Sequence, residues 1–350
     1  MMAYLKENNK ALKLYDTTDM NEISSEATEV RERINGNLVF FNHNIHLEPS
    51  NVCIHRCKFC SYRRDDDTAS GAWSMSLDEI KEFCTKIFKP SMTEVHITGS
   101  VHPSRNFEYY VSIIRILRDL LPEQVAIKAY SAVEIDDMCI SSGKTVEEIL
   151  GTLKDAGLSA LPGGGAEIFA HSVRSIIAPD KCDGNRWLQI HRTAHKLGIR
   201  SNCTMLFGHI ENRAHRVDHL LKLKELQSET GGFDAFIPLL FKNRGNSLSY
   251  IVELNLSEIL KTFAISRIVL DNIPHIKSYW PMLGKEVCGL TLLYGADDID
   301  GTINDTTRIF SSAGSSEQKP SMSREELTAI ASEFGYKAVE RDSFYNIVEK

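Results

Sequence analysis

The chain has 350 residues, of which 47 are acidic and 40 are basic, so its formal net charge is −7. A chain of this length can form two average domains or one large α/β barrel. The balance holds no basic excess to neutralise phosphates, which argues against nucleic acid as the main partner. No apolar run approaches the roughly 18 residues that span a bilayer, and the polar N-terminal segment is unlike a secretory signal. We therefore expect a cytoplasmic enzyme or binding protein without a membrane segment.

Strand-like and helix-like segments alternate along most of the chain. Short apolar runs rich in β-branched residues predict eight strands, at residues 45–47, 94–98, 125–129, 158–161, 200–206, 233–237, 267–270 and 287–293. A helix is expected over residues 213–229, before two glycines. Further helix starts are marked by three capping boxes, in which Ser76 precedes Glu79, Thr145 precedes Glu148 and Ser323 precedes Glu326.

Eight strands that alternate with helices predict a parallel (β/α)8 barrel of the TIM type, with a doubly wound open sheet as the structural alternative. Two observations favour the barrel. The composition shows no internal break where two domains would join, and chemistry-bearing residues recur just after the strand runs, as they do at the top of a barrel. We divide the chain into an N-terminal helical segment, residues 1–43, and a barrel with a C-terminal helical extension, residues 44–350.

Three of the eight cysteines, Cys53, Cys57 and Cys60, fall within eight residues with the spacing C-x3-C-x2-C. Three thiolates on a tight loop can each hold one iron of a cubane cluster, which leaves a fourth iron open for chemistry. A zinc ion would normally need a fourth Cys or His, and the position of His55 fits no common zinc motif. A structural zinc site or an iron–sulfur electron carrier is the alternative from another functional class.

With Phe59 as the aromatic residue, the pattern C-x3-C-x-aromatic-C resembles the signature of the radical S-adenosylmethionine (SAM) enzymes. The resemblance implies a [4Fe–4S] cluster held by Cys53, Cys57 and Cys60. It also implies that SAM chelates the fourth iron through its amino and carboxylate groups. One electron, from an external donor such as flavodoxin or ferredoxin, would then cleave SAM to methionine and a 5′-deoxyadenosyl radical.

Other stretches match positions at which this family contacts SAM. Residues 204–211 resemble the segment that lies against the adenine, and residues 98–100 stand where the family often reads the methionine amino group. Residues 163–165 are three glycines, which allow close backbone approach to a ligand, and Glu167 after them can accept hydrogen bonds from a ribose or an ammonium. The SAM-binding residues implied in this way are Phe59, Gly99, Ser100, Glu167, Thr204, Leu206 and Gly208.

From about residue 45 to residue 345, the chain is most similar to the aminofutalosine synthase family of the futalosine route to menaquinone. The stretches that carry this similarity are residues 161–169, 204–211, 232–239, 270–277 and 295–302. Two related families share parts of them: the cyclic dehypoxanthinylfutalosine synthases and the tyrosine-using half of FO synthase. The run Phe-Ile-Pro-Leu at residues 236–239 resembles the first family more than either relative.

The closer resemblance implies a definite reaction, in which the 5′-deoxyadenosyl radical adds to the enol-ether carbon of 3-[(1-carboxyvinyl)oxy]benzoate. The products would be 6-amino-6-deoxyfutalosine, methionine and bicarbonate, so that SAM is consumed as a co-substrate. Because this substrate carries two carboxylates, cationic or hydrogen-bond-donating groups must meet them. Polar residues near the predicted strand ends also include Lys277. The candidate substrate contacts are His96, His209, Asp271, Asn272 and His275.

Overall fold

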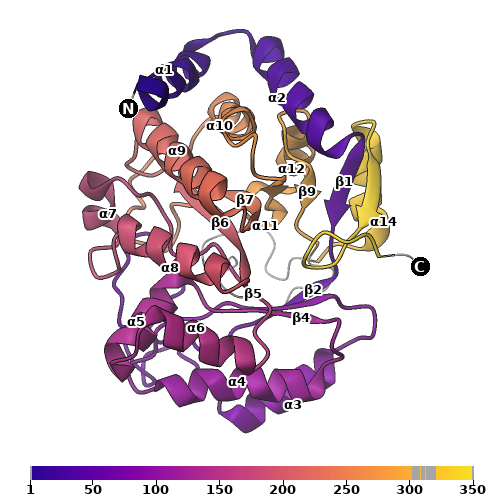
Figure 1. Cartoon of the computed structure of the whole chain (residues 1–350). Coiled ribbons are helices and arrows are strands. Elements are labelled where there is room, and N and C mark those ends of the chain that lie inside the picture. Colours follow the sequence, from indigo (N-terminus) through magenta and orange to yellow (C-terminus); the bar gives the residue numbers. More distant parts are fainter. Residues whose placement is uncertain (1, 302–307, 309–311, 313–320, 349–350) are drawn as a thin grey trace.

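The computed structural model describes residues 2–301, 308, 312 and 321–348, with strands at the centre and helices around them (Figure 1). Ten strands of the described residues form one curled parallel sheet, in the order β10-β1-β9-β8-β7-β6-β5-β4-β3-β2. Their bounds are β1 Leu38–Phe41, β2 Asn44–Leu47, β3 Glu94–Ile97, β4 Ala126–Lys128, β5 Ala160–Leu161, β6 Arg200–Phe207, β7 Phe233–Leu240, β8 His275–Ser278, β9 Asp298–Ile299 and β10 Lys337–Glu340.

The helices cover the outer face of this sheet, and their buried stripes form the core against it. In α4, for example, Val111, Ile114 and Leu117 are fully buried at a spacing of one turn. The helices are α1 Met2–Asp16, α2 Met20–Asn35, α3 Leu77–Ile87, α4 Phe107–Leu120, α5 Ala132–Ser142, α6 Val146–Asp155, α7 His171–Ile177, α8 Gly184–Lys196, α9 Arg213–Thr230, α10 Leu256–Val269, α11 Trp280–Leu283, α12 Lys285–Leu292 and α14 Arg324–Glu333.

The predicted fold class is confirmed, because strands β2 to β9 supply eight parallel strands of the TIM type. Strands β1 and β10 lengthen the sheet beyond β9, so that β2 and β10 stand at its two ends. The three predicted capping boxes form at Ser76, Thr145 and Ser323. Helix α9 ends, as expected, at Gly231 in the left-handed conformation.

Two of the eight predicted strands are wrong. Residues 267–270 form the end of α10, and residues 287–293 lie mostly within α12. Both runs are short and apolar, and the periodicity of such a run cannot distinguish a buried strand from a buried helix. Helix α10 is buried on most of its surface, which hides its period of 3.6 residues. The seventh and eighth strands of the barrel are instead β8 and the two-residue strand β9.

The N-terminal segment joins the barrel more intimately than a separate helical unit would. Ile23 and Ala27 of α2 pack with Ala264 of α10 in a small apolar cluster. Strand β1, which lies within residues 1–43, pairs with β9 and β10. The division of the chain between residues 43 and 44 therefore stays a prediction from the sequence.

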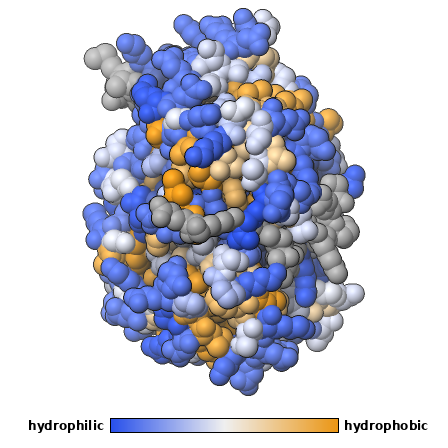
Figure 2. All heavy atoms as spheres, turned by 90° about the vertical axis from the view of Figure 1, so that its right-hand side faces the viewer, coloured by the Kyte–Doolittle hydropathy of each residue, from blue (hydrophilic) through white to orange (hydrophobic). Residues whose placement is uncertain are grey.

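The outer surface is largely hydrophilic on the face that Figure 2 presents, with hydrophobic residues in smaller groups between the polar ones. Within the described ranges, no helix combines the length and the apolar character that a membrane crossing requires.

Candidate active site

A cavity of about 330 Å³ lies inside the curled sheet and among the loops that follow its strands. The loops after β2, β3, β4 and β5 each contribute lining residues, as do the inward-facing side chains of β6 and β7. Because the carboxyl ends of parallel strands meet at one edge, residues far apart in sequence converge there. Polar and charged groups from eight different strands or their loops therefore share this one space.

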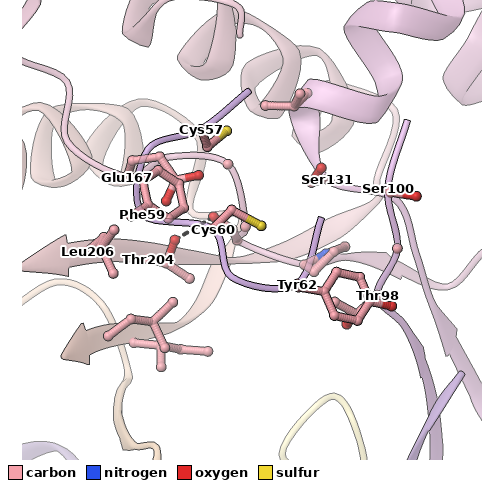
Figure 3. Close-up of a pocket in the computed structure, with 18 of the residues that line it drawn as sticks. Cys57, Phe59, Cys60, Tyr62, Thr98, Ser100, Ser131, Glu167, Thr204 and Leu206 are labelled. Carbon is pink, nitrogen blue, oxygen red and sulfur yellow. Dashed lines mark hydrogen bonds between the residues drawn. The ribbon is translucent and has the colours of Figure 1, made fainter. Parts of the chain in front are cut away.

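The loop after β2 carries Cys53, Cys57 and Cys60, and all three free thiols line the cavity. Figure 3 shows the sulfur atoms of Cys57 and Cys60 on this loop. The backbone N–H of Cys53 donates to the carbonyl of Arg64 at 3.1 Å, and the backbone N–H of Lys58 donates to the carbonyl of Ile177 at 2.8 Å. The loop is thus held from two sides. Burial raises the pKa of the Cys57 thiol to about 11.

The three thiols fit a cubane cluster better than a single metal ion. Across the described residues, no three His, Cys, Asp or Glu side chains are grouped so as to hold one ion. A zinc site needs such convergence, whereas in a cubane each thiolate binds a separate iron. Three cysteines on one loop that share a cavity wall meet the second requirement.

Glu167 lies beside Phe59 at this wall of the cavity (Figure 3), and its carboxylate accepts a hydrogen bond from Lys181 at 2.8 Å. Lys181 also lies 5.3 Å from the centre of the Phe59 ring. The pKa of Glu167 lies below its usual value: burial acts to raise it, but Lys181 and Arg174 outweigh burial. Glu167 has a φ of 48°, a conformation that an L-residue adopts only under constraint.

The glycine loop after β5 is packed tightly against its neighbours. A Cβ on Gly163 would lie 2.6 Å from Cα of Cys203, and one on Gly165 would lie 2.6 Å from Val133 Cγ2. The carbonyl of Gly163 accepts from Thr204 Oγ1 at 2.6 Å. These glycines are required by the protein's own packing, in addition to any ligand that approaches them.

The loop after β3 supports the cysteine loop directly. Ser100 Oγ donates to the carbonyl of Val52 at 2.6 Å, and Gly99 lines the cavity next to it. Glu134 also lines the cavity, and burial raises its pKa. Sequence reasoning missed Glu134, although its capping box with Ser131 is visible in the sequence.

Six further predicted residues divide between the cavity and other places. Thr204, Leu206 and His96 line it, with Thr204 and Leu206 side by side on β6 (Figure 3). Gly208 and His209 do not line it. They form a turn whose backbone N–H groups donate to Glu211 at 2.7 and 2.8 Å. The sixth, His275, belongs to another cluster, described below.

The prediction that Asp271 and Asn272 face the cavity is wrong. The pair lies in the turn between α10 and β8, at the amino end of β8 and so at the edge opposite the cysteine loop. Asp271 forms an ion pair with Lys224 at 3.0 Å, and Asn272 donates to the carbonyl of Lys224 at 2.9 Å. The error follows from the prediction of a strand at residues 267–270. A pair that follows a strand lies at the carboxyl end of the barrel, whereas this pair follows helix α10 and precedes β8, and so lies at the amino end.

His275 is buried but does not line the cavity. Its Nδ1 lies 2.6 Å from a carboxylate oxygen of Asp297, and its ring stacks on Tyr345 with the centres 3.6 Å apart. These contacts give His275 a structural role between β8 and the C-terminal segment.

Deeper in the cavity lies a second polar group that the sequence did not bring together. His46 and His96 are paired in register on β2 and β3, with ring centres 5.0 Å apart. Lys277 on β8 donates to Asp300 at 2.9 Å. Burial lowers the pKa of His96 to about 3, so its imidazole is neutral near pH 7. All four side chains line the cavity.

Comparison with known proteins defines the class. Residues 47–223 match the radical SAM superfamily, and residues 230–350 match the CofH/MqnC C-terminal region. The chain therefore belongs to the radical SAM superfamily and is an enzyme that uses a [4Fe–4S] cluster and SAM. The alternative of a structural zinc protein or an electron carrier is set aside.

Within that superfamily, two similar proteins are aminodeoxyfutalosine synthases. That of Thermus thermophilus is 42% identical, over 96% of this chain and 91% of its own length. The aminodeoxyfutalosine synthase of Streptomyces coelicolor is 39% identical, over 96% of this chain and 89% of its own length. A 5-amino-6-(D-ribitylamino)uracil–L-tyrosine 4-hydroxyphenyl transferase of Methanopyrus kandleri is 34% identical, over 95% and 90%.

Solved structures agree on the fold. Methylornithine synthase superimposes with a TM-score of 0.75 over 95% of this chain and 93% of its own, at 16% identity. The FeFe-hydrogenase maturase of Carboxydothermus hydrogenoformans superimposes with a TM-score of 0.72 over 98% of this chain and 81% of its own, also at 16% identity.

Proposed function

We propose that this chain is an aminodeoxyfutalosine synthase, which adds the 5′-deoxyadenosyl group of SAM to 3-[(1-carboxyvinyl)oxy]benzoate. The products are 6-amino-6-deoxyfutalosine, methionine and bicarbonate, in menaquinone biosynthesis. The observation that carries the proposal is the 42% and 39% identity to two aminodeoxyfutalosine synthases over 96% of the chain. A cyclic dehypoxanthine futalosine synthase of Streptomyces coelicolor is 37% identical over 87% of the chain.

In this proposal, Cys53, Cys57 and Cys60 hold the cluster. The bound cluster and SAM supply the adenosyl radical. SAM lies against the wall that includes Phe59, Glu167 and the neighbouring residues Gly99, Ser100, Thr204 and Leu206. The position of these residues around one cavity supports the assignment. Gly208 acts indirectly, since its turn follows β6 without lining the cavity.

The cavity also meets the need of a radical reaction for a largely apolar space. Leu206, Ile237 and Met282 are among its lining residues. Such side chains offer no polar groups to the radical and keep water away from it, which suppresses competing reactions.

An external one-electron donor, such as a flavodoxin or a ferredoxin, would supply the electron that the bound cluster needs. Ile54, Arg56 and Lys58 are exposed on the cysteine loop, which leaves its outer side open to a partner protein. All eight cysteines are free thiols. A reduced thiol set is typical of the cytoplasm, where we place the reaction.

SAM labelled in the adenosyl group tests the proposed reaction. After anaerobic incubation with reductant and the enolpyruvyl benzoate, the synthase should place the label in a product that also contains the benzoate ring. Stoichiometric labelled 5′-deoxyadenosine without a labelled adduct would contradict the synthase and favour the cyclising relative, in which the radical only abstracts hydrogen.

A further inference from the structure

The deep end of the cavity is built by three strands, and the segment that follows β10 hydrogen-bonds to carboxylates beside it. His46, His96 and Lys277 line it from β2, β3 and β8. His46 and Lys277 are almost completely buried. Their side chains bring two imidazoles and one ammonium into a space that is otherwise walled mainly by apolar groups.

Lys277 keeps hydrogen-bonding capacity toward the cavity. Its ammonium has three N–H donors. One donates to Asp300 at 2.9 Å, while the nearest oxygen of Asp298 is 3.9 Å away, too far for a hydrogen bond. Asp298 is held instead by Arg341, whose Nε and Nη2 donate to it at 2.9 and 2.6 Å.

The segment after β10 also contacts a second carboxylate, that of Glu94. Glu94 lines the cavity and accepts a hydrogen bond from Lys128 at 2.7 Å. Ser343 Oγ, two residues after Arg341, donates to the same carboxylate. Arg341 and Ser343 are both buried, and through them this segment hydrogen-bonds to the carboxylates of Asp298 and Glu94.

Chemistry orients the substrate within this space. The alkene must approach the radical carbon to roughly 3–3.5 Å, so the carboxyvinyl end faces the cysteine loop. The ring carboxylate, which the product retains, then points toward the deep end. A buried carboxylate requires donors, and charge-assisted hydrogen bonds from lysine or imidazole are the strong ones.

We propose that Lys277, with His46 and His96, binds the ring carboxylate of the substrate, and that Arg341 is a positioning residue that keeps Asp298 away from Lys277. The proposal rests on the proposed function, because it takes its substrate from there. In this proposal, His46, His96 and Lys277 bind the carboxylate that the product retains, and not the carboxylate that is released as bicarbonate.

The test compares two substrates with the cluster-loaded full chain. One is the enolpyruvyl benzoate, and the other is the same enol ether on an unsubstituted phenyl ring. The wild type should prefer the first by roughly 10- to 100-fold in kcat/KM, the value of one charged hydrogen bond. Lys277→Met should remove most of this preference by slowing the first substrate only. Equal loss with both substrates, or a retained preference, would overturn the proposal.

A matched control is Lys261→Met. Lys261 is also a buried lysine, but it donates to the carbonyls of Tyr15 and Thr17 outside the cavity, so the preference should persist. If Lys277→Met fails to bind the cluster, His96→Asn gives a second measurement, and an unchanged preference in that variant counts against the proposal. Failure of the proposed function looks different, because the wild type would then form no labelled adduct with either substrate.

Arg341→Met separates positioning from a merely structural role. It should raise the KM for the benzoate while leaving the KM for the phenyl analogue and the cluster spectrum unchanged. A variant that loses stability but keeps both KM values would show that Arg341 only holds the fold.

Discussion

Lys181 donates a hydrogen bond to Glu167 at 2.8 Å and so ties the loop before α8 to the glycine loop after β5. The sequence singled out Glu167 but gave no reason to choose Lys181, which lies 14 residues later. The pair borders Phe59 of the cysteine loop. A ligand that approaches this wall therefore meets one carboxylate that is already partly neutralised.

Replacing Glu167 by Gln should weaken SAM binding without changing the cluster spectrum. The change removes a negative acceptor and keeps the shape of the side chain. A hydrogen bond to a charged group contributes about 1.5–3 kcal/mol, or one to two decades in affinity. Equilibrium binding of SAM to the cluster-loaded variant measures the effect, and an unchanged affinity would remove Glu167 from the SAM site.

Alanine at Cys53, Cys57 or Cys60 should abolish iron loading and SAM cleavage together. Three thiolates are the minimum that holds this type of cluster. Alanine at Cys84, Cys139 or Cys288 provides the control, because these thiols are buried away from the cavity. Iron content and anaerobic absorption spectra report the outcome. Loss of the cluster in a Cys139 variant with retention in a Cys57 variant would reverse the assignment.

Two neighbouring glycines offer a paired test of the packing around the loop after β5. Gly163→Ala would place a Cβ 2.6 Å from the backbone of Cys203, so it should cost about 1–3 kcal/mol or more in free energy of unfolding. Gly164→Ala meets nothing closer than Ser131 Cβ at 3.8 Å and should be tolerated. Urea unfolding measures the free energy of unfolding of both variants. Similar values would mean that the loop can shift to make room for the Cβ at residue 163.

Arg216→Met should destabilise the fold by about 3–5 kcal/mol, because it leaves the buried carboxylate of Glu211 without its ion-pair partner at 2.7 Å. The matched control is Arg192→Met: Arg192 pairs with Glu229 at the surface, so its loss should cost less than about 1 kcal/mol. Urea unfolding at pH 7 compares the two variants, and equal losses would contradict the difference in burial.

The effect of Arg216 should also depend on pH. Burial acts to raise the pKa of Glu211, but His209, Arg216 and the N–H of Gly208 outweigh it and lower that pKa. A carboxyl whose folded-state pKa is depressed stabilises the fold above its unfolded pKa of about 4.3, and this contribution is lost as the pH falls through the folded pKa. The stability difference between wild type and Arg216→Met should therefore stay nearly constant from pH 7 to about pH 4.3 and narrow as the pH falls below that value. A difference that stayed constant below that value as well would mean that Glu211 does not titrate in this range.

Local sequence features determined much of the fold. The capping boxes at Ser76, Thr145 and Ser323 formed as predicted, because a cap is satisfied within four residues of chain. Six strands were found from apolar runs, and the alternation of strands with helices predicted a parallel barrel. The cysteine motif predicted three thiols on one loop for the same local reason.

Tertiary structure decided where the other site residues fall. Asp271 and His275 had polar character at a supposed strand end, but only the course of α10 into β8 places them away from the cavity. His46 and Lys277 line the same cavity because the sheet curls and brings β2 and β8 around it, although 231 residues separate them. Arg341 reaches Asp298 across 43 residues, through a strand that the sequence did not predict. Chain patterns specify local conformation, whereas such contacts depend on how the whole sheet closes.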